Sequence, residues 1–304
     1  MKNLKSRGHL LTEQSNPESE NLDRLTSLEI VELFNREDVK TIAAIAEARI
    51  PLAKTIDVTT EAIGRGGRLF YVGAGTSGRL GVLDAAECPP TFCTPPELVQ
   101  GIIAGGAAAL VRSSEDLEDS QEDGERAIAH HRITELDVVI GIAAGGTTPF
   151  VHGALQAAKE RGANTVAISC VPVEQVSINA DIDIRLLVGA EILTGSTRLK
   201  AGTATKMALN IISTGVMVRL GKVYGNRMID VAVTNNKLRD RALRIIGDLT
   251  ELDHSEAEKL LQLSGQRVKL ALLMQWMGVD ADTGEHLLDK HRGNLRAALQ
   301  DREL

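Results

Sequence analysis

Residues 68–79 read RLFYVGAGTSGR, a hydrophobic run that passes directly into a loop with glycine at positions 73, 75 and 78. Leu80, Val82 and Leu83 follow at a spacing typical of a helix. The stretch therefore predicts a strand, a tight turn and a helix. Glycines permit such a turn, and the N–H groups at a helix start point toward an anion. Because Thr76 and Ser77 add hydroxyl groups at the same place, we expect this loop to bind phosphate.

Two other interpretations of this loop can be weighed from the sequence. The glycine spacing also fits a dinucleotide-binding fingerprint, which needs an acid at the end of the next strand to bind the ribose. That strand ends in residues 102–105, IIAG, which contain no acid. No Gly-Lys-Ser/Thr follows either, so the loop of nucleotide triphosphatases is absent. A tight turn without a ligand remains open as the plainer alternative.

The same alternation of hydrophobic runs and helical stretches continues along the chain. It predicts an α/β fold with a doubly wound, mainly parallel sheet. Two further loops that follow predicted strands are rich in glycine and hydroxyl groups. Because ligands bind at the carboxyl ends of parallel strands, we expect all three loops to converge on one site. The predicted strands cover residues 68–72, 98–103, 138–142, 165–169 and 182–187, and the binding candidates in the two further loops are Gly146, Thr147, Thr148, Ser196 and Thr197.

The rest of the chain divides into a lead-in and a helical tail. Residues 1–50 read as a polar arm and a helix, 51–235 as the α/β domain that carries the three phosphate-binding loops, and 236–304 as a small C-terminal helical bundle. A second helix is expected over 53–63. Residues 201–220 predict a long helix that is too apolar for a surface position. In the tail, helices are expected over 266–277 and 282–290, with Trp276 as a core residue and without a cofactor role.

The composition excludes several classes of protein. A formal charge of −7 and 2% aromatic residues disfavour a nucleic-acid partner, which needs a basic face. No apolar run approaches the roughly 20 residues of a membrane-spanning helix. The first twenty residues are polar and lack the apolar stretch of a secretory signal, so we expect a cytoplasmic protein. Three cysteines do not suggest disulfides, and no set of four ligands predicts a metal.

The motifs taken together resemble those of a known family, the N-acetylmuramic acid 6-phosphate etherases, which are built on the sugar isomerase (SIS) fold. The resemblance extends over nearly the whole chain. The chain is also similar to the vertebrate glucokinase regulatory protein, which binds ligands on the same fold and responds to them. The most specific matches are GAGTSGRLG (73–81), DAAECPPT (84–91), EDS (118–120) and TGSTRLKAGTA (194–204).

The resemblance implies a reaction and two catalytic carboxyl groups. The family removes the lactyl ether at carbon 3 of the phosphorylated sugar and gives D-lactate and N-acetylglucosamine 6-phosphate, as part of cell-wall sugar recycling. Glu87 matches the family's proton donor, and Glu118 matches the second glutamate, which we assign as the base at carbon 2. Residues 88–90, Cys-Pro-Pro, are expected to stop the helix just after Glu87. Such acid and base steps typically contribute about 10²–10⁴-fold in rate.

Further side chains are expected near the sugar phosphate. Lys200, with Arg79 and Arg198, is a candidate charge partner of the phosphate, and Glu191 is expected either to contact the sugar or to cap the segment that follows. His130, His131 and His152 show no partner pattern and are given no role as ligands. A homodimer is expected because sites on this fold resemble sites shared between subunits, and no cofactor is implied.

The sequence departs from the family pattern at three positions. Gly145 and Thr147 stand where the second loop usually carries serine and arginine, and Val171 stands where many relatives have asparagine. The departures widen the range of possible substrates. Two other functions therefore stay open, a phosphosugar isomerase and a non-enzymatic sugar-phosphate sensor. Both predicted catalytic glutamates favour the etherase over the sensor.

Overall fold

The computed structural model describes residues 7–112 and 117–301, and the chain separates into two compact units. The first unit comprises Met1–Ala86 and Glu97–Ser213, and the second Glu87–Pro96 and Thr214–Leu304. The predicted boundaries at residues 50 and 235 stay predictions. No helix of the described chain is long and apolar enough to cross a membrane.

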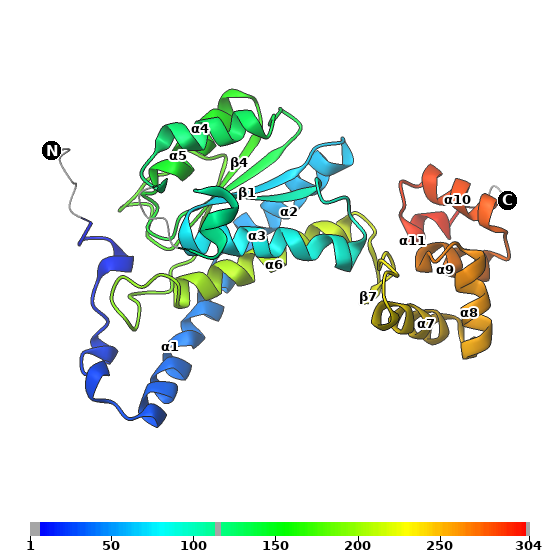
Figure 1. Cartoon of the computed structure of the whole chain (residues 1–304), viewed down its shortest axis with the longest axis horizontal. Helices are drawn as coiled ribbons and strands as arrows, with labels where there is room; N and C mark the ends of the chain where they lie inside the picture. The colour runs from blue at the N-terminus through cyan, green and yellow to red at the C-terminus, as the bar shows by residue number, and fades with distance from the viewer. Residues whose placement is uncertain (1–6, 113–116, 302–304) are drawn as a thin grey trace. The chain divides into compact units, whose positions relative to one another are not determined.

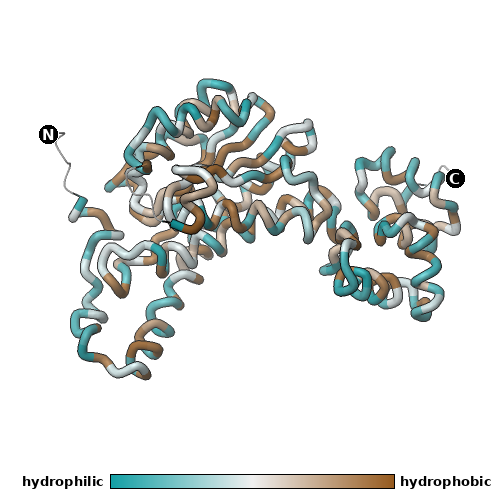
Figure 2. The backbone as a smooth tube through the Cα atoms, viewed as in Figure 1, coloured by the Kyte–Doolittle hydropathy of each residue, from teal (hydrophilic) through white to brown (hydrophobic). Residues whose placement is uncertain are grey.

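The first unit contains five parallel strands in the order β2-β1-β3-β4-β5 (Figure 1). This arrangement confirms the predicted doubly wound sheet. The inner strands β1 and β3 are buried at every position, as expected for parallel strands that are covered on both faces. Figure 2 shows hydrophobic residues along the strands and hydrophilic residues along the outer helix α4. The strands are β1 (Leu69–Gly73), β2 (Val99–Ile103), β3 (Val138–Ile142), β4 (Asn164–Ser169) and β5 (Ile182–Arg185). The helices of this unit are α1 (Ser27–Glu47), α2 (Arg49–Gly64), α4 (Gln121–His130) and α5 (Pro149–Glu160), together with most of α3 (Gly75–Phe92) and of α6 (Lys200–Arg219), whose last residues belong to the second unit.

Alternate residues of β1 face two different helical layers. Phe70 and Val72 belong to the core cluster formed with α4 and α5. Tyr71 points to the other layer, where its hydroxyl donates a hydrogen bond to Asp84 of α3 at 2.9 Å. Ser213 of α6 donates to the same carboxylate at 3.2 Å. Burial raises the pKa of Asp84, against the effect of these two bonds. Helices α3 and α6 therefore cover one face of the sheet, and α4 and α5 cover the other (Figure 1).

Helix α6 corrects one prediction about burial. We expected the helix over 201–220 to be enclosed, and Leu209, Ile212 and Val216 of α6 are indeed buried. Ile211, however, is 38% exposed and Val218 is 49% exposed. The high apolar density of this helix therefore serves both the core and a surface.

The second unit is helical, as predicted for the tail of the chain. A short antiparallel pair, β6 (Val223–Tyr224) and β7 (Arg227–Met228), precedes the helices. Buried leucine, isoleucine and alanine residues of these helices form one core, against which Trp276 packs. Trp276 therefore has the predicted core position. The helices are α7 (Asn236–Thr250), α8 (His254–Leu263), α9 (Val268–Met277), α10 (Ala281–Lys290) and α11 (Leu295–Ala298).

Candidate functional site

The strand order places the topological switch point of the sheet between β1 and β3. These two strands are neighbours, with Gly73 paired to Ile142 at their carboxyl ends. The helix that follows β1 covers one face of the sheet, and the helix that follows β3 covers the other. Ligands of open α/β sheets bind where the connections diverge in this way. The first and second predicted phosphate loops flank this point.

The first loop is as tight as its glycines predict. Gly75 has φ +53°, a value that side chains rarely tolerate. A Cβ atom on Gly78 would lie 2.6 Å from Ile103 Cγ1 and 2.7 Å from Gly73 O, so only glycine fits. The turn starts α3 at once and leaves Thr76 and Ser77, both half-buried, in its first helical turn. Helix-start N–H groups and two hydroxyl groups are thus presented together at the sheet edge.

The second loop ends at α5 in the expected way. Gly146 has φ +70°, and Pro149 occupies the first helical turn, where it needs no N–H. His152 lies 2.7 Å from the Gly146 carbonyl through Nε2, which supports its predicted place as a satisfied residue. Thr147 and Thr148 are half-buried beside these residues. The loop therefore offers hydroxyl groups at the carboxyl end of β3.

The third loop lies against the first. A Cβ atom on Gly202 would be 3.5 Å from Thr76 Cγ2 and 3.4 Å from the Thr197 carbonyl oxygen. A cavity of about 280 Å³ adjoins this contact. Ser196 and Thr197 are half-buried nearby in the chain. The residues that line the cavity are Thr76, Leu80, Arg198, Gly202, Thr203, Lys206 and Met207.

Two polar side chains that line the cavity were not predicted from the sequence, Thr203 and Lys206. Both are exposed on α6, and they follow Arg198 and Leu199 at helical spacing. That spacing could have identified them as neighbours of the loop. With Arg198, Lys206 makes the cavity beside Thr76 cationic, which suits an anionic ligand.

Lys200 and Glu191 require a correction, because both side chains are buried and already paired within the protein. The Lys200 ammonium is fully buried and forms an ion pair with Glu37 at 2.5 Å. The Glu191 carboxylate accepts hydrogen bonds from the N–H groups of Lys200, at 3.0 Å, and Ala201, at 2.9 Å. Glu191 therefore caps α6, the second of the two roles considered for it. Burial raises its pKa, although these two bonds and Lys200 lower it.

Arg79 is also engaged within the protein. Its guanidinium donates to the carbonyl oxygens of Leu110, at 3.1 Å, and Arg112, at 3.4 Å. These bonds hold the chain that follows β2. Arg79 therefore has a structural role after the first loop, and its presence there does not require a phosphate ligand.

Glu87 lies within α3 and not beyond its end. The helix continues through Pro89 and Pro90 to Phe92, so the predicted stop was wrong. Proline has a φ value compatible with a helix, and these two prolines remove N–H groups only near the end of α3. The helix ends where Cys93 adopts φ +51° and donates its N–H to the Pro89 carbonyl. Glu87 is exposed on this last part of the helix.

Glu118 is held next to the second loop. Its carbonyl oxygen accepts the Phe150 N–H at 3.0 Å, in the first turn of α5. Two residues later, Ser120 caps α4 by accepting the Asp123 N–H at 3.1 Å. The side chain of Glu118 is half-buried. Its backbone is therefore fixed at its own carbonyl and two residues later, near the hydroxyl groups that follow β3.

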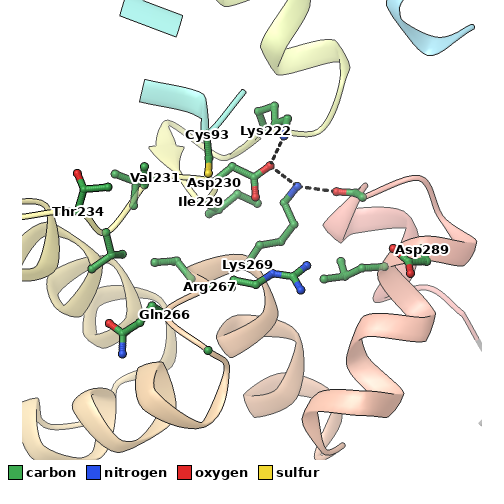
Figure 3. Close-up of a pocket in the computed structure, with 16 residues that line it drawn as sticks. Cys93, Lys222, Ile229, Asp230, Val231, Thr234, Gln266, Arg267, Lys269 and Asp289 are labelled. Atoms are coloured by element: carbon green, nitrogen blue, oxygen red, sulfur yellow. Dashed lines mark hydrogen bonds and ion pairs between the residues drawn. The ribbon is translucent and has the colours of Figure 1, made fainter. Parts of the chain in front are cut away.

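The second unit has a separate cavity of about 510 Å³ (Figure 3). Asp230 points to two lysines, Lys222 at 3.0 Å and Lys269 at 2.6 Å, and Lys269 also donates to the Gly293 carbonyl. The bonds connect the turn after β7 to α9 and the turn before α11. None of the predicted site residues lines this cavity.

Three family models match successive parts of the chain. The N-terminal SIS domain of glucokinase regulatory protein matches residues 51–159, and the general SIS domain matches 117–214. The C-terminal lid domain of glucokinase regulatory protein matches residues 225–291. The predicted sugar isomerase fold is thus confirmed.

Curated relatives match the chain over nearly its full length. A protein of Gloeothece citriformis, named N-acetylmuramic acid 6-phosphate etherase, is 76% identical over 299 residues, which are 98% of each chain. A protein of the same name from Crocosphaera subtropica is 72% identical over 300 residues, covering 99% of this chain and 98% of the relative. By this likeness and by its SIS domain, the chain belongs to the N-acetylmuramic acid 6-phosphate etherase family.

Proposed function

We propose that the protein cleaves the D-lactyl ether of N-acetylmuramic acid 6-phosphate and contributes to cell-wall sugar recycling. The single observation that carries the proposal is full-length identity of 76% to a relative named for this activity. The hydroxyl-lined carboxyl edge of β1 and β3 supports it independently, because this edge suits a phosphorylated ligand.

The reaction is an elimination followed by the addition of water. In the open-chain sugar, the aldehyde makes the proton on carbon 2 acidic. A carboxylate removes that proton, the bond between carbon 3 and the ether oxygen breaks, and a carboxylic acid protonates the departing lactate. Water then adds its oxygen to carbon 3 while carbon 2 regains a proton. The balance is one water consumed and one D-lactate and one N-acetylglucosamine 6-phosphate formed.

We assign the two proton transfers to Glu118 and Glu87. Glu118, whose backbone is fixed beside the second loop, would be the base at carbon 2. Glu87 would protonate the ether oxygen and then activate the water. Each transfer would contribute about 10²–10⁴-fold to the rate.

The phosphate would bind to the first and third loops. Thr76 and Ser77 offer hydroxyl groups and helix-start N–H groups, and Ser196 and Thr197 add hydroxyl groups from the third loop. The exposed cations Arg198 and Lys206, beside Thr76, replace Lys200 as the proposed charge partners. Gly146, Thr147 and Thr148 would contact the sugar from the second loop. No cofactor enters this scheme.

A homodimer in the cytoplasm is the proposed working form. One helical face of α1 exposes four large apolar residues, Leu28, Val31, Val39 and Ile42, each at least 55% exposed. They occupy one stripe, because 28 and 39, like 31 and 42, are eleven residues apart, close to three helical turns. Such an exposed apolar stripe suits contact with a second copy of the chain.

The spacing along α3 also fits a site shared between two copies. Glu87 lies eleven residues after Thr76 in the same helix, so a site that uses both residues could take one of them from each copy. Sedimentation of Val39→Glu should then show a monomer, whereas an unchanged species would exclude this interface.

Exchange in D₂O tests the assignment of the two glutamates. If Glu118 is the base, Glu87→Gln should still exchange the carbon 2 proton of the substrate for deuterium while it releases no lactate. Glu118→Gln should lose both exchange and release. The reverse pattern would exchange the two roles. Aldose–ketose interconversion without lactate would support the isomerase, and binding without exchange or release by the wild-type protein would support the sensor.

A further inference from the structure

The N-terminal arm, residues 7–16, is anchored to the loops at the edge of the sheet. The Leu11 N–H donates to Gln175 Oε1 at 2.9 Å, and Gln175 Nε2 donates in turn to the His9 carbonyl at 3.1 Å. At the other end, Asn16 Nδ2 donates to the Ala190 carbonyl at 3.2 Å and to Glu37 at 2.8 Å. A short 3-10 turn, Leu11–Glu13, is therefore held between two fixed points.

Within this turn, Thr12 carries a buried hydroxyl group without a partner. The residue is 1% exposed, and its Oγ1 forms no hydrogen bond with any described residue. Buried polar groups are generally hydrogen-bonded, so an exception in a binding region indicates a missing partner.

The surroundings of Thr12 identify where that partner would lie. Oγ1 is 3.6 Å from the position that a Cβ atom on Gly145 would occupy, and Thr147 Oγ1 is 3.9 Å from the same position. Two hydroxyl groups from distant parts of the chain thus meet at the second loop. Gly145 has no side chain to satisfy either of them.

The next residue of the arm reaches the third loop. Glu13 Oε2 is 3.3 Å from the position of a Cβ atom on Gly195, which has φ +77°. The arm therefore touches both the loop after β3 and the loop before α6. Since Glu13 is negatively charged, this part of the site disfavours phosphate and suits neutral hydroxyl or amide groups.

From these contacts we infer that the arm is part of the sugar site, and that Thr12 Oγ1 hydrogen-bonds a hydroxyl or acetamido group of the ligand. Glu13 accepts a second hydrogen bond from the same neutral part of the sugar. The inference rests on the proposed function for the identity of the ligand. Thr12 is a positioning residue that fixes the sugar relative to its phosphate.

The test compares Thr12→Val with Thr59→Val. Both changes replace a buried, unpartnered hydroxyl with a methyl group of similar size, but Thr59 lies in α2. Calorimetry measures the affinity for N-acetylglucosamine 6-phosphate and for inorganic phosphate. Loss of one neutral hydrogen bond should weaken sugar-phosphate binding by about tenfold in Thr12→Val. Thr59→Val should bind like the wild type, and affinity for inorganic phosphate should not change in either variant.

A second change at Gly145 separates ligand contact from folding. Gly145→Ser introduces a hydroxyl beside Thr12 at an uncrowded position and should recover part of the affinity lost in Thr12→Val. Equal affinity of Thr12→Val and wild type, or equal losses for sugar phosphate and inorganic phosphate, would overturn the inference. Because binding of a stable product is measured, the result does not depend on lactate release. A wild-type protein that binds the sugar phosphate but releases no lactate would refute the proposed function alone.

Discussion

Replacing Glu37 tests whether the Lys200 ion pair supports the fold. Lys200 is fully buried, and the side chain of Glu37 is 4% exposed. Glu37 also accepts hydrogen bonds from Asn16, at 2.8 Å, and from Lys40, at 2.6 Å. The change Glu37→Gln removes the charge of the carboxylate and leaves a buried ammonium without a counter-ion.

The cost should be large for a single substitution. Removing one partner of a buried ion pair typically costs about 3–5 kcal/mol, whereas replacing both by apolar groups is often nearly neutral. We expect Glu37→Gln to lie near the lower value, because the amide oxygen still accepts a hydrogen bond. The double variant Glu37→Gln/Lys200→Met should recover most of that loss. Lys40→Met is a matched control, since Lys40 is half-exposed and an exposed pair contributes about 0–1 kcal/mol.

Denaturant titrations at several pH values measure the free energy of unfolding of each variant. Burial disfavours the charged form of Glu37 and would raise its pKa. The hydrogen bonds from Lys200, Lys40 and Asn16 outweigh this effect and lower the pKa from 4.5 to about 2. The pair should therefore stabilise the wild type fully above pH 4.5, and this contribution should disappear as the pH falls toward 2. The reasoning is refuted if Glu37→Gln costs no more than Lys40→Met, or if the double variant is no more stable than Glu37→Gln.

Two further predictions concern the packing of α3 on β1. Because burial raises the folded-state pKa of Asp84 above 3.8, its ionisation should cost stability as the pH rises from 3.8 through that value. The free energy of unfolding of the wild type should then fall relative to Asp84→Asn over this range, and a constant difference would contradict the argument. A Cβ atom on Gly81 would lie 2.7 Å from Tyr71 Cβ, so Gly81→Ala should cost about 1–3 kcal/mol. Gly64→Ala, in a helix with no atom within 4 Å, is its control in thermal unfolding and should be neutral or stabilising.

The strands of the sheet could be predicted because each one is recognised from a few consecutive residues of the sequence. Both β1 and β3 are short hydrophobic runs that lead into glycine- and hydroxyl-rich loops, and β3 (Val138–Ile142) begins and ends where the sequence predicts. Helix starts were less exact, since the helix expected over 53–63 begins at Arg49. The prolines after Glu87 misled the prediction, because α3 continues through both of them to Phe92.

Contacts between distant residues could not be predicted in the same way. Nothing near Lys200 in the sequence reveals that its partner is Glu37, 163 positions away. The polar arm gave no sign that Thr12 would be buried or that Leu11 would bond to Gln175, 164 positions away. A hydroxyl-rich loop therefore predicts a binding site, but not which charged side chains near it are already paired within the protein.

Lactate release measures the central claim most directly. The purified protein would be incubated with N-acetylmuramic acid 6-phosphate, and D-lactate assayed beside Glu87→Gln and Glu118→Gln. We predict lactate from the wild type and a loss of about 10²–10⁴-fold in each variant. No lactate from a folded wild-type protein that binds the sugar phosphate would contradict the etherase function, and full activity in either variant would contradict the role of that glutamate.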